Sequence, residues 1–229
     1  MNGFKYLKII IILAVIPSLI FVNTHFLHNE NYYLTSTAIL VALMLPFGLE
    51  YKNKKPNTKK LVLTASLAAI ATIGRIAFYM IPQFKPVLAI VIISSVVVGP
   101  YEGFMVGALT GFVSNFYFGQ GPWTPFQMLI WGLIGFGAGI CYRQLRKRKL
   151  LLYGYGVLAG ALFSIVMDTA MALWMDGEIV KARWISFLVA SLPILAIYVV
   201  SNVLFLWLLH EPFRRFFERM RIKYGIGIH

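Results

Sequence analysis

The sequence predicts an all-helical integral membrane protein, and three observations support this fold class. Hydrophobic residues make up 59% of the 229 residues and the mean hydropathy is +0.77, whereas soluble domains are about half apolar or less. Apolar runs close to the roughly 20 residues that a helix needs to cross a bilayer recur along the whole chain. These runs do not alternate apolar and polar residues as the strands of a membrane barrel do.

Eight apolar segments are each expected to form one transmembrane helix. They lie near residues 9–25, 33–49, 61–81, 87–99, 103–118, 126–142, 151–175 and 184–209. The first has the basic start of a signal peptide but no small-residue cleavage site, so we expect a retained helix. The fourth is short because Pro86 and Pro100 bound it, and proline interrupts helices.

Lysine and arginine residues predict the orientation, because cytoplasmic loops retain them. Eight crossings place 17 of the 21 basic residues on one side, together with both termini. The remaining four lie in or beyond the membrane: Arg75, Lys85, Lys181 and Arg183. The net charge of +13 is thereby explained by contact with anionic lipid headgroups of the bilayer. No nucleic-acid partner is expected.

A basic linker divides the chain into unequal parts. We expect a two-helix N-terminal hairpin over 1–50, a basic cytoplasmic linker over 51–60, a six-helix core over 61–209 and a basic cytoplasmic tail over 210–229. The core holds nearly all the glycines. We therefore expect it to be the functional module.

Small residues recur four apart on several of these helices. Gly103, Gly107 and Gly111 share one helix face, and this spacing predicts close helix packing in lipid. The segments GFGAG (135–139) and GVLAG (156–160) repeat the pattern. Ala65 and Ala69 form a similar ridge near the cytoplasmic start of their helix. That ridge either packs internally or receives another subunit.

Two ionisable residues inside predicted helices are candidate functional groups, because charges in the bilayer are costly. Arg75 and Asp168 both lie about 21–25 Å from the cytoplasmic side at roughly 1.5 Å per residue. A pair between them either stabilises the bundle or lines an outward polar cavity. Asn115 lies slightly lower and is expected to join either arrangement.

The segment NFYFGQGPWTPFQM, residues 115–128, interrupts the apolar pattern on the outer side. Irregular backbone at the membrane must be covered by protein or line a wet cavity. Tyr117 and Trp123 offer flat apolar walls, and Gln120 and Gln127 offer amide groups suited to a ring-bearing solute. The alternative is an interfacial aromatic anchor with a tight turn.

Signatures of catalysis and of metal binding are absent from the sequence. There is no H-E-x-x-H or G-x-S-x-G motif, the four histidines are not at metal-ligand spacing, and there is no nucleotide-binding P-loop. We expect no enzyme activity, no cofactor and no metal. Uphill transport would require an ATPase on another chain.

The six-helix region resembles the substrate-binding S component of an energy-coupling factor (ECF) transporter, a prokaryotic vitamin importer. The resemblance rests on Ala65-x-x-x-Ala69, on GRIAFYMIPQFKPVLAIVI (74–92), on GPYEGFMVGALTGFVSNFYFGQGPWTPFQM (99–128) and on the basic loop between the fourth and fifth core helices. It covers about two-thirds of the chain. The N-terminal hairpin departs from the usual six-helix plan.

The resemblance implies a multi-pass protein of the cytoplasmic membrane that binds a vitamin outside. It would dock on a T subunit driven by two ATPase subunits and topple to release its load. GQGPWTP is similar to the cobalamin-related branch, so cobalamin or a precursor is the expected ligand. The implied docking residues are Ala65 and Ala69, and the expected substrate-binding residues are Arg75, Gln83, Lys85, Asn115, Tyr117, Gln120, Trp123, Gln127, Asp168, Trp174, Asp176 and Trp184.

Two alternative functions differ in class from transport. One is an intramembrane enzyme with an unrecognised site, and the other is a membrane assembly subunit. Copurification of a vitamin favours the carrier, and turnover of lipid or peptide favours the enzyme.

Overall fold

The computed structural model describes residues 2–52 and 58–224, and these contain helices but no β-strand. The expected all-helical fold is therefore confirmed. Four helical stretches are long and apolar enough to cross a membrane: Phe4–His25, Thr58–Ala77, Lys149–Asp176 and Leu192–Lys223. Shorter apolar helices cover Tyr32–Pro46 and Val87–Val98. The protein is a multi-pass membrane protein, and the eight-crossing topology remains a prediction.

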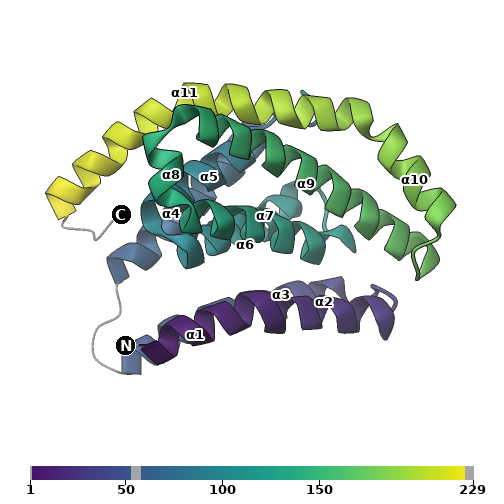
Figure 1. The fold of residues 1–229 in the computed structure, drawn as a ribbon. Coiled ribbons are helices and arrows are strands. Elements are labelled where there is room, and N and C mark those ends of the chain that lie inside the picture. The colour runs from purple at the N-terminus through teal and green to yellow at the C-terminus, as the bar shows by residue number, and fades with distance from the viewer. Residues whose placement is uncertain (1, 53–57, 225–229) are drawn as a thin grey trace.

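The N-terminal part is a helical hairpin. Helix α1 (Asn2–Ile10), a π-helical turn η1 (Ile11–Val15) and α2 (Ile16–His25) continue one another, and α3 (Tyr32–Lys52) runs back beside them. Ile12, Ile16 and Leu43 from the hairpin pack with Phe104 and Met128 in a shared core cluster. The hairpin is thus attached by apolar packing along one side of the remaining helices (Figure 1).

The larger part of the chain forms a bundle with its own core. Its helices are α4 (Thr58–Ala77), α5 (Val87–Val98), α6 (Pro100–Phe118), α7 (Trp123–Ile140), α8 (Tyr142–Lys147), α9 (Lys149–Asp176), α10 (Lys181–Ala190) and α11 (Leu192–Tyr224). Helix α5 is buried along almost its whole length. A helix surrounded by protein does not have to match the bilayer thickness, which accounts for its 12 residues.

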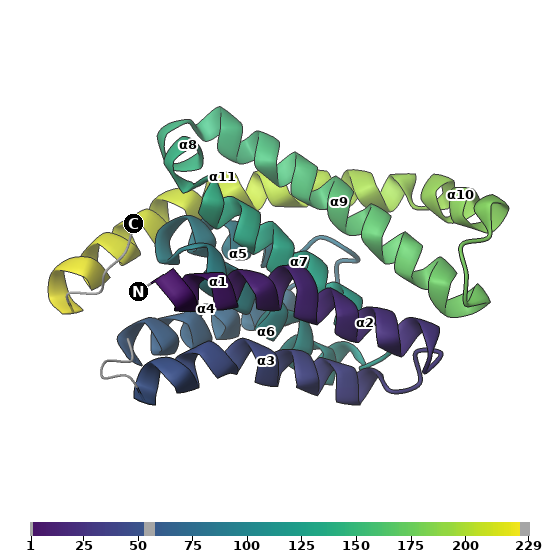
Figure 2. The same ribbon diagram turned by 60° about the horizontal axis from the view of Figure 1, so that its bottom comes forward.

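The basic segments gather at one end of the molecule, here called the basic end. The start of α1, α8 and the last turns of α11 all lie there, and the α2–α3 turn and the α9–α10 connection lie at the opposite end (Figures 1 and 2). Lys60 at the start of α4 pairs with the buried Glu102 of α6 at 2.8 Å. The middle of the expected basic linker, 53–57, and the last five residues of the expected tail lie outside the described residues.

Helices α6 and α7 approach each other closely through glycine. A Cβ added at Gly107 would lie 2.3 Å from the carbonyl oxygen of Trp131, and one at Gly135 would lie 2.3 Å from that of Gly103. Any larger side chain would push the two backbones apart. The predicted close packing of the glycine-spaced helices is confirmed here, and at Gly156 an added Cβ would meet Leu206 at 2.5 Å.

Several helix boundaries differ from those expected. Helix α7 begins at Trp123 rather than near 126, so the tryptophan belongs to its first turn. The apolar segment 184–209 does not form one helix, because the helical hydrogen bonding is interrupted at Ser191, between α10 and α11. Leu192 and Pro193 follow this break, and a proline early in a helix loses no hydrogen bond.

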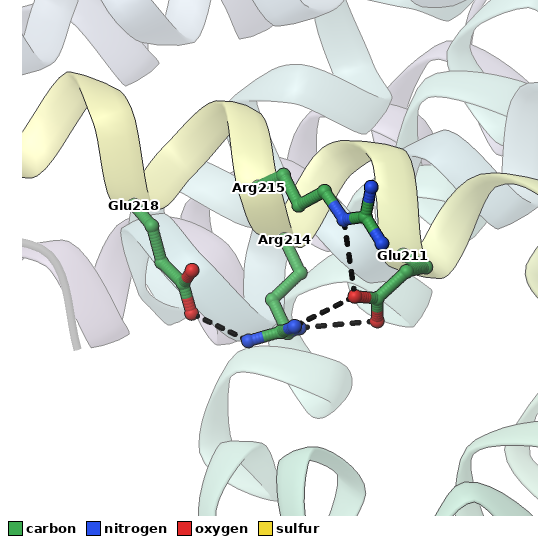
Figure 3. Close-up of polar contacts among 4 residues, drawn as sticks. All are labelled: Glu211, Arg214, Arg215 and Glu218. Atoms are coloured by element: carbon green, nitrogen blue, oxygen red, sulfur yellow. Dashed lines mark hydrogen bonds and ion pairs between the residues drawn. The ribbon is translucent and has the colours of Figure 1, made fainter.

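Helix α11 also continues through the expected tail as far as Tyr224. Pro212 inside it cannot donate a backbone hydrogen bond. Just beyond it, Arg214 bonds Glu211 at 2.6 Å and Glu218 at 2.7 Å, and Arg215 bonds Glu211 at 3.3 Å (Figure 3). Each such pair adds about 0.2–0.5 kcal/mol to a helix, which supports the helix beyond the proline.

Candidate ligand-binding site

Two adjoining cavities lie towards the end of the bundle opposite the basic end. The larger, of about 400 Å³, is lined by residues of α9, α10, α11, the first turn of α7 and the α4–α5 connection. The smaller, of about 50 Å³, is bounded by α4, α5, α7 and α11. Gln83, Phe163 and Tyr198 line both. Their shared wall makes the two cavities one candidate site with two compartments.

Gln83 occupies a special position in the connection between α4 and α5. Its backbone φ is +57°, a left-handed conformation uncommon outside glycine and associated with functional sites. Its side-chain oxygen accepts a hydrogen bond from the Tyr198 hydroxyl at 2.5 Å. The strained loop therefore places an amide against the aromatic wall that both compartments share.

Arg75, near the end of α4, is held by neutral groups. Its guanidinium donates to Ser114 Oγ at 2.5 Å and to Asn115 Oδ1 at 2.7 Å. It also lies over the rings of Phe118 at 4.2 Å and Trp131 at 5.1 Å from their centroids. These contacts fix the direction of the guanidinium along the wall of the smaller cavity.

Lys85 also lines the smaller cavity, and its backbone is hydrogen-bonded to Ser201 of α11. Its N–H donates to Ser201 Oγ at 2.9 Å, and the Ser201 hydroxyl donates to its carbonyl at 3.0 Å. Its ammonium lies 5.5 Å from the centroid of the Phe118 ring. Burial lowers the pKa of Lys85, and the nearby Arg75 lowers that pKa further.

The polar turn between α6 and α7 is stabilised by its own side chains. Asn115 donates to Thr124 at 3.0 Å and to Gln127 at 2.7 Å. Thr124 donates to Gln120 at 3.0 Å, and Gln120 donates to the Phe112 carbonyl at 2.9 Å. Gly119 reverses the chain with φ of +99°, which favours glycine. The network connects this turn to Arg75.

The larger compartment has aromatic walls and one carboxylate. Asp168 on α9 accepts a hydrogen bond from Ser191 Oγ at 2.5 Å, at the break between α10 and α11. Trp123 stands edge-on to Trp174, with centroids 6.5 Å apart. Phe163 packs edge-on to Tyr198 at 4.9 Å. A flat solute would find apolar faces here and one anionic acceptor.

The predicted site residues fall into three groups. Those that line a cavity are Arg75, Gln83, Lys85, Trp123, Gln127 and Asp168. Those that hold the polar turn behind the cavities are Asn115 and Gln120. The remaining four line neither cavity. Tyr117 is 55% exposed. Trp174 packs on Trp123, Asp176 pairs with Arg183, and Trp184 donates a hydrogen bond to Thr169 at 3.0 Å.

The expected direct pair between Arg75 and Asp168 is not formed. Asp168 is bonded to Ser191, and Arg75 is bonded to α6. The two residues line different compartments on either side of Tyr198. The similar depth expected for the two residues did not predict their partners, because Arg75 bonds side chains of α6 and Asp168 bonds Ser191.

Several lining residues were not singled out from the sequence. Phe163, Ser191 and Tyr198 lie in apolar stretches and have the appearance of ordinary core residues. Tyr198 is separated from Gln83 by 115 positions. Pro193, two residues after Ser191, is a local sequence signal that could have drawn attention to this segment.

Ala65 and Ala69 lie on an exposed face of α4. Val62 and Ile73 on the same helix are 59% and 65% exposed. The alternative that this ridge packs inside the protein is therefore wrong for the described chain. Small residues flanked by large apolar ones are left facing the lipid or a partner.

Comparison with known proteins gives a consistent picture. A UPF0397 protein of Aliivibrio salmonicida is 32% identical over 99 residues, which cover 41% of this chain and 53% of the relative. A UPF0397 protein of Vibrio atlanticus is 30% identical over 99 residues, which again cover 41% of this chain and 53% of the relative. The chain thus spans about half the length of these relatives. No solved structure matches it. The family model described as the ECF-type riboflavin transporter, S component, matches residues 55–212, more than half of the chain, and the protein belongs to this family.

Proposed function

We propose that this protein is the substrate-binding subunit of an ECF importer in a prokaryotic cytoplasmic membrane. The observation that carries the proposal is the two-compartment site in a chain of this family. The basic end faces the cytoplasm, so the site opens near the outer surface. Residues 61–209 form the binding core, and residues 1–50 are an accessory hairpin.

The ligand is a micronutrient with a flat ring system. Pockets for small molecules usually measure about 300–1,000 Å³, and the larger compartment of about 400 Å³ suits a ring system of flavin size. The family's description points to riboflavin. Cobalamin or a precursor, suggested by the GQGPWTP segment, is much larger than a flavin and would have to project from the mouth of the site.

Calorimetry on the purified protein with riboflavin, cobalamin and other vitamins tests this function. Saturable binding of one vitamin, at about one molecule per protein, is the expected result. A matching rise in melting temperature should accompany it. If no vitamin binds to folded protein and none is present after purification, the proposed function is wrong.

The partners are a T subunit and two ATPase subunits, and the exposed ridge of Ala65 and Ala69 receives the T subunit. Small residues allow close helix approach, which provides much of the association energy in lipid. Ala69→Trp should keep ligand affinity but abolish copurification with the T subunit and ATP-driven uptake. Ala196→Trp, at another exposed position on α11, is the matched control and should leave both intact. Loss of ligand binding in Ala69→Trp would contradict a docking role.

A further inference from the structure

The smaller compartment carries positive charge that the protein does not neutralise. Within residues 2–52 and 58–224, no carboxylate forms an ion pair or a hydrogen bond with Arg75 or Lys85. The guanidinium of Arg75 donates its hydrogen bonds to a hydroxyl and to an amide oxygen, both uncharged. The Lys85 ammonium donates to the Ile81 carbonyl at 3.3 Å. The two side chains thus bring two cations to the wall of one small cavity.

Such an arrangement is costly in the absence of a further group. A charge withdrawn from water needs a partner of opposite charge or several hydrogen bonds. The ring of Phe118 lies under both cations, 4.2 Å from Arg75 and 5.5 Å from Lys85. A cation–π contact compensates only part of a charge. The two cations also repel each other, so an anion entering between them would lower the free energy of the site.

The larger compartment has the opposite polarity. Asp168 is the carboxylate among the residues that line it, and its hydrogen bond comes from the neutral Ser191 hydroxyl. The wall of Gln83, Phe163 and Tyr198 separates this acceptor from the two cations. A bound molecule that spans both compartments would therefore meet donors at one end and an acceptor at the other.

We propose, resting on the function proposed above, that the ligand carries a carboxylate or phosphate group that binds in the smaller compartment between Arg75 and Lys85. Its ring body fills the larger compartment, and a hydrogen-bond donor of the ligand faces Asp168. The volume of about 50 Å³ admits one such group, since a water molecule takes about 30 Å³ in the liquid. The planar guanidinium of arginine is well suited to carboxylate and phosphate oxygens.

Matched ligand pairs that differ in the anionic group test this assignment on the purified full-length protein. The pairs are riboflavin 5′-phosphate with riboflavin, cobinamide phosphate with cobinamide, biotin with biotinamide, and pantothenate with pantothenol. For the pair that binds, the anionic member should bind at least about tenfold more tightly. Arg75→Gln should bring the affinity ratio close to one, and Lys85→Gln should lower it partly. Lys181→Gln, an exposed lysine outside both cavities, should preserve it.

Inorganic phosphate provides a second probe that needs no vitamin. At equal ionic strength, phosphate should raise the melting temperature of the wild-type protein above its value in chloride, and Arg75→Gln should abolish the difference. Equal binding of both members of the binding pair, or a ratio that survives both substitutions, overturns the anion site and leaves the proposed function standing. Absence of phosphate protection in the folded wild type also counts against it. Failure of every vitamin to bind is instead the result that overturns the proposed function.

Discussion

Two helix pairs beside the candidate site are held together in different ways. On one side, α6 and α7 pack backbone to backbone through glycine, and an added Cβ at Gly107 would meet the Trp131 carbonyl at 2.3 Å. On the other side, α10 has no buried residue. It is attached to α9 by polar contacts at Asp168, Asp176 and Thr169. Helices α6 and α7 are thus held by close backbone packing, which makes this side rigid. Helix α10 is held by polar contacts that can exchange with water.

The difference follows from the membrane environment. Helices in lipid gain little from the hydrophobic effect, so close van der Waals packing supplies the stability of α6 and α7. Helix α10 lies at the end of the bundle (Figure 1), where surface ion pairs contribute about 1 kcal/mol or less each. We therefore expect ligand specificity to reside mainly on the rigid side and ligand entry to involve movement of α10.

The largest effect should come from disrupting the glycine contact. Gly107→Leu should cost about 3 kcal/mol of folding free energy, because its side chain cannot fit against the α7 backbone. The yield of monodisperse protein and its melting temperature measure this. Gly154→Leu on α9, where no atom lies within 4 Å of an added Cβ, is the control. Equal stability of the two variants would show that the α6–α7 wall is not rigid.

Removing an aromatic side chain from the rigid side should reduce affinity without unfolding the protein. Trp123→Ala should weaken ligand binding by about 2 kcal/mol, a typical value for an aromatic residue that anchors a binding site. Calorimetry against the identified vitamin provides the measurement. Trp207→Ala, which removes a 63% exposed ring on α11, should leave affinity unchanged. Unaltered binding in folded Trp123→Ala would remove this wall from the site.

Loosening the α10 side should have a smaller effect on stability. Ser191→Ala removes the hydrogen bond to Asp168 and should cost about 1 kcal/mol. Trypsin should then cut faster at Lys181 or Arg183, because α10 separates from α9 more often. Ser186→Ala is the control on the same helix, since that hydroxyl bonds the Ala182 carbonyl in its own turn. A large loss of stability in Ser191→Ala would make the two walls equally rigid.

The smallest effect concerns Arg75 and Asp168 in the ligand-free protein. Because they line different compartments, Arg75→Gln and Asp168→Asn should be additive in unfolding free energy to within about 0.5 kcal/mol. A double-mutant cycle followed by thermal unfolding measures the coupling. A coupling well above this value would restore the direct pair that the sequence suggested.

The sequence predicted the elements better than it predicted the site. Long apolar runs identified nearly every helix, and glycine spacing predicted that the glycine-bearing helices pack closely, because both depend on residues close together in the chain. The prediction of a single helix over 184–209 was wrong, because apolar composition does not reveal the interruption at Ser191. Six predicted residues line the cavities, whereas Tyr198 was missed because only its contact with Gln83 distinguishes it from a core aromatic residue.

The sequence by itself determined that this is a helical membrane protein with one basic end, since hydropathy and charge act segment by segment. It also predicted a similar depth for Arg75 and Asp168, because an α-helix rises about 1.5 Å per residue. Tertiary structure alone decided the direction in which each side chain points. Arg75 meets Asn115 rather than Asp168, and Ala65 and Ala69 face outward. The rotation of a helix about its axis is set by the neighbours against which it packs, and those neighbours come from distant parts of the chain.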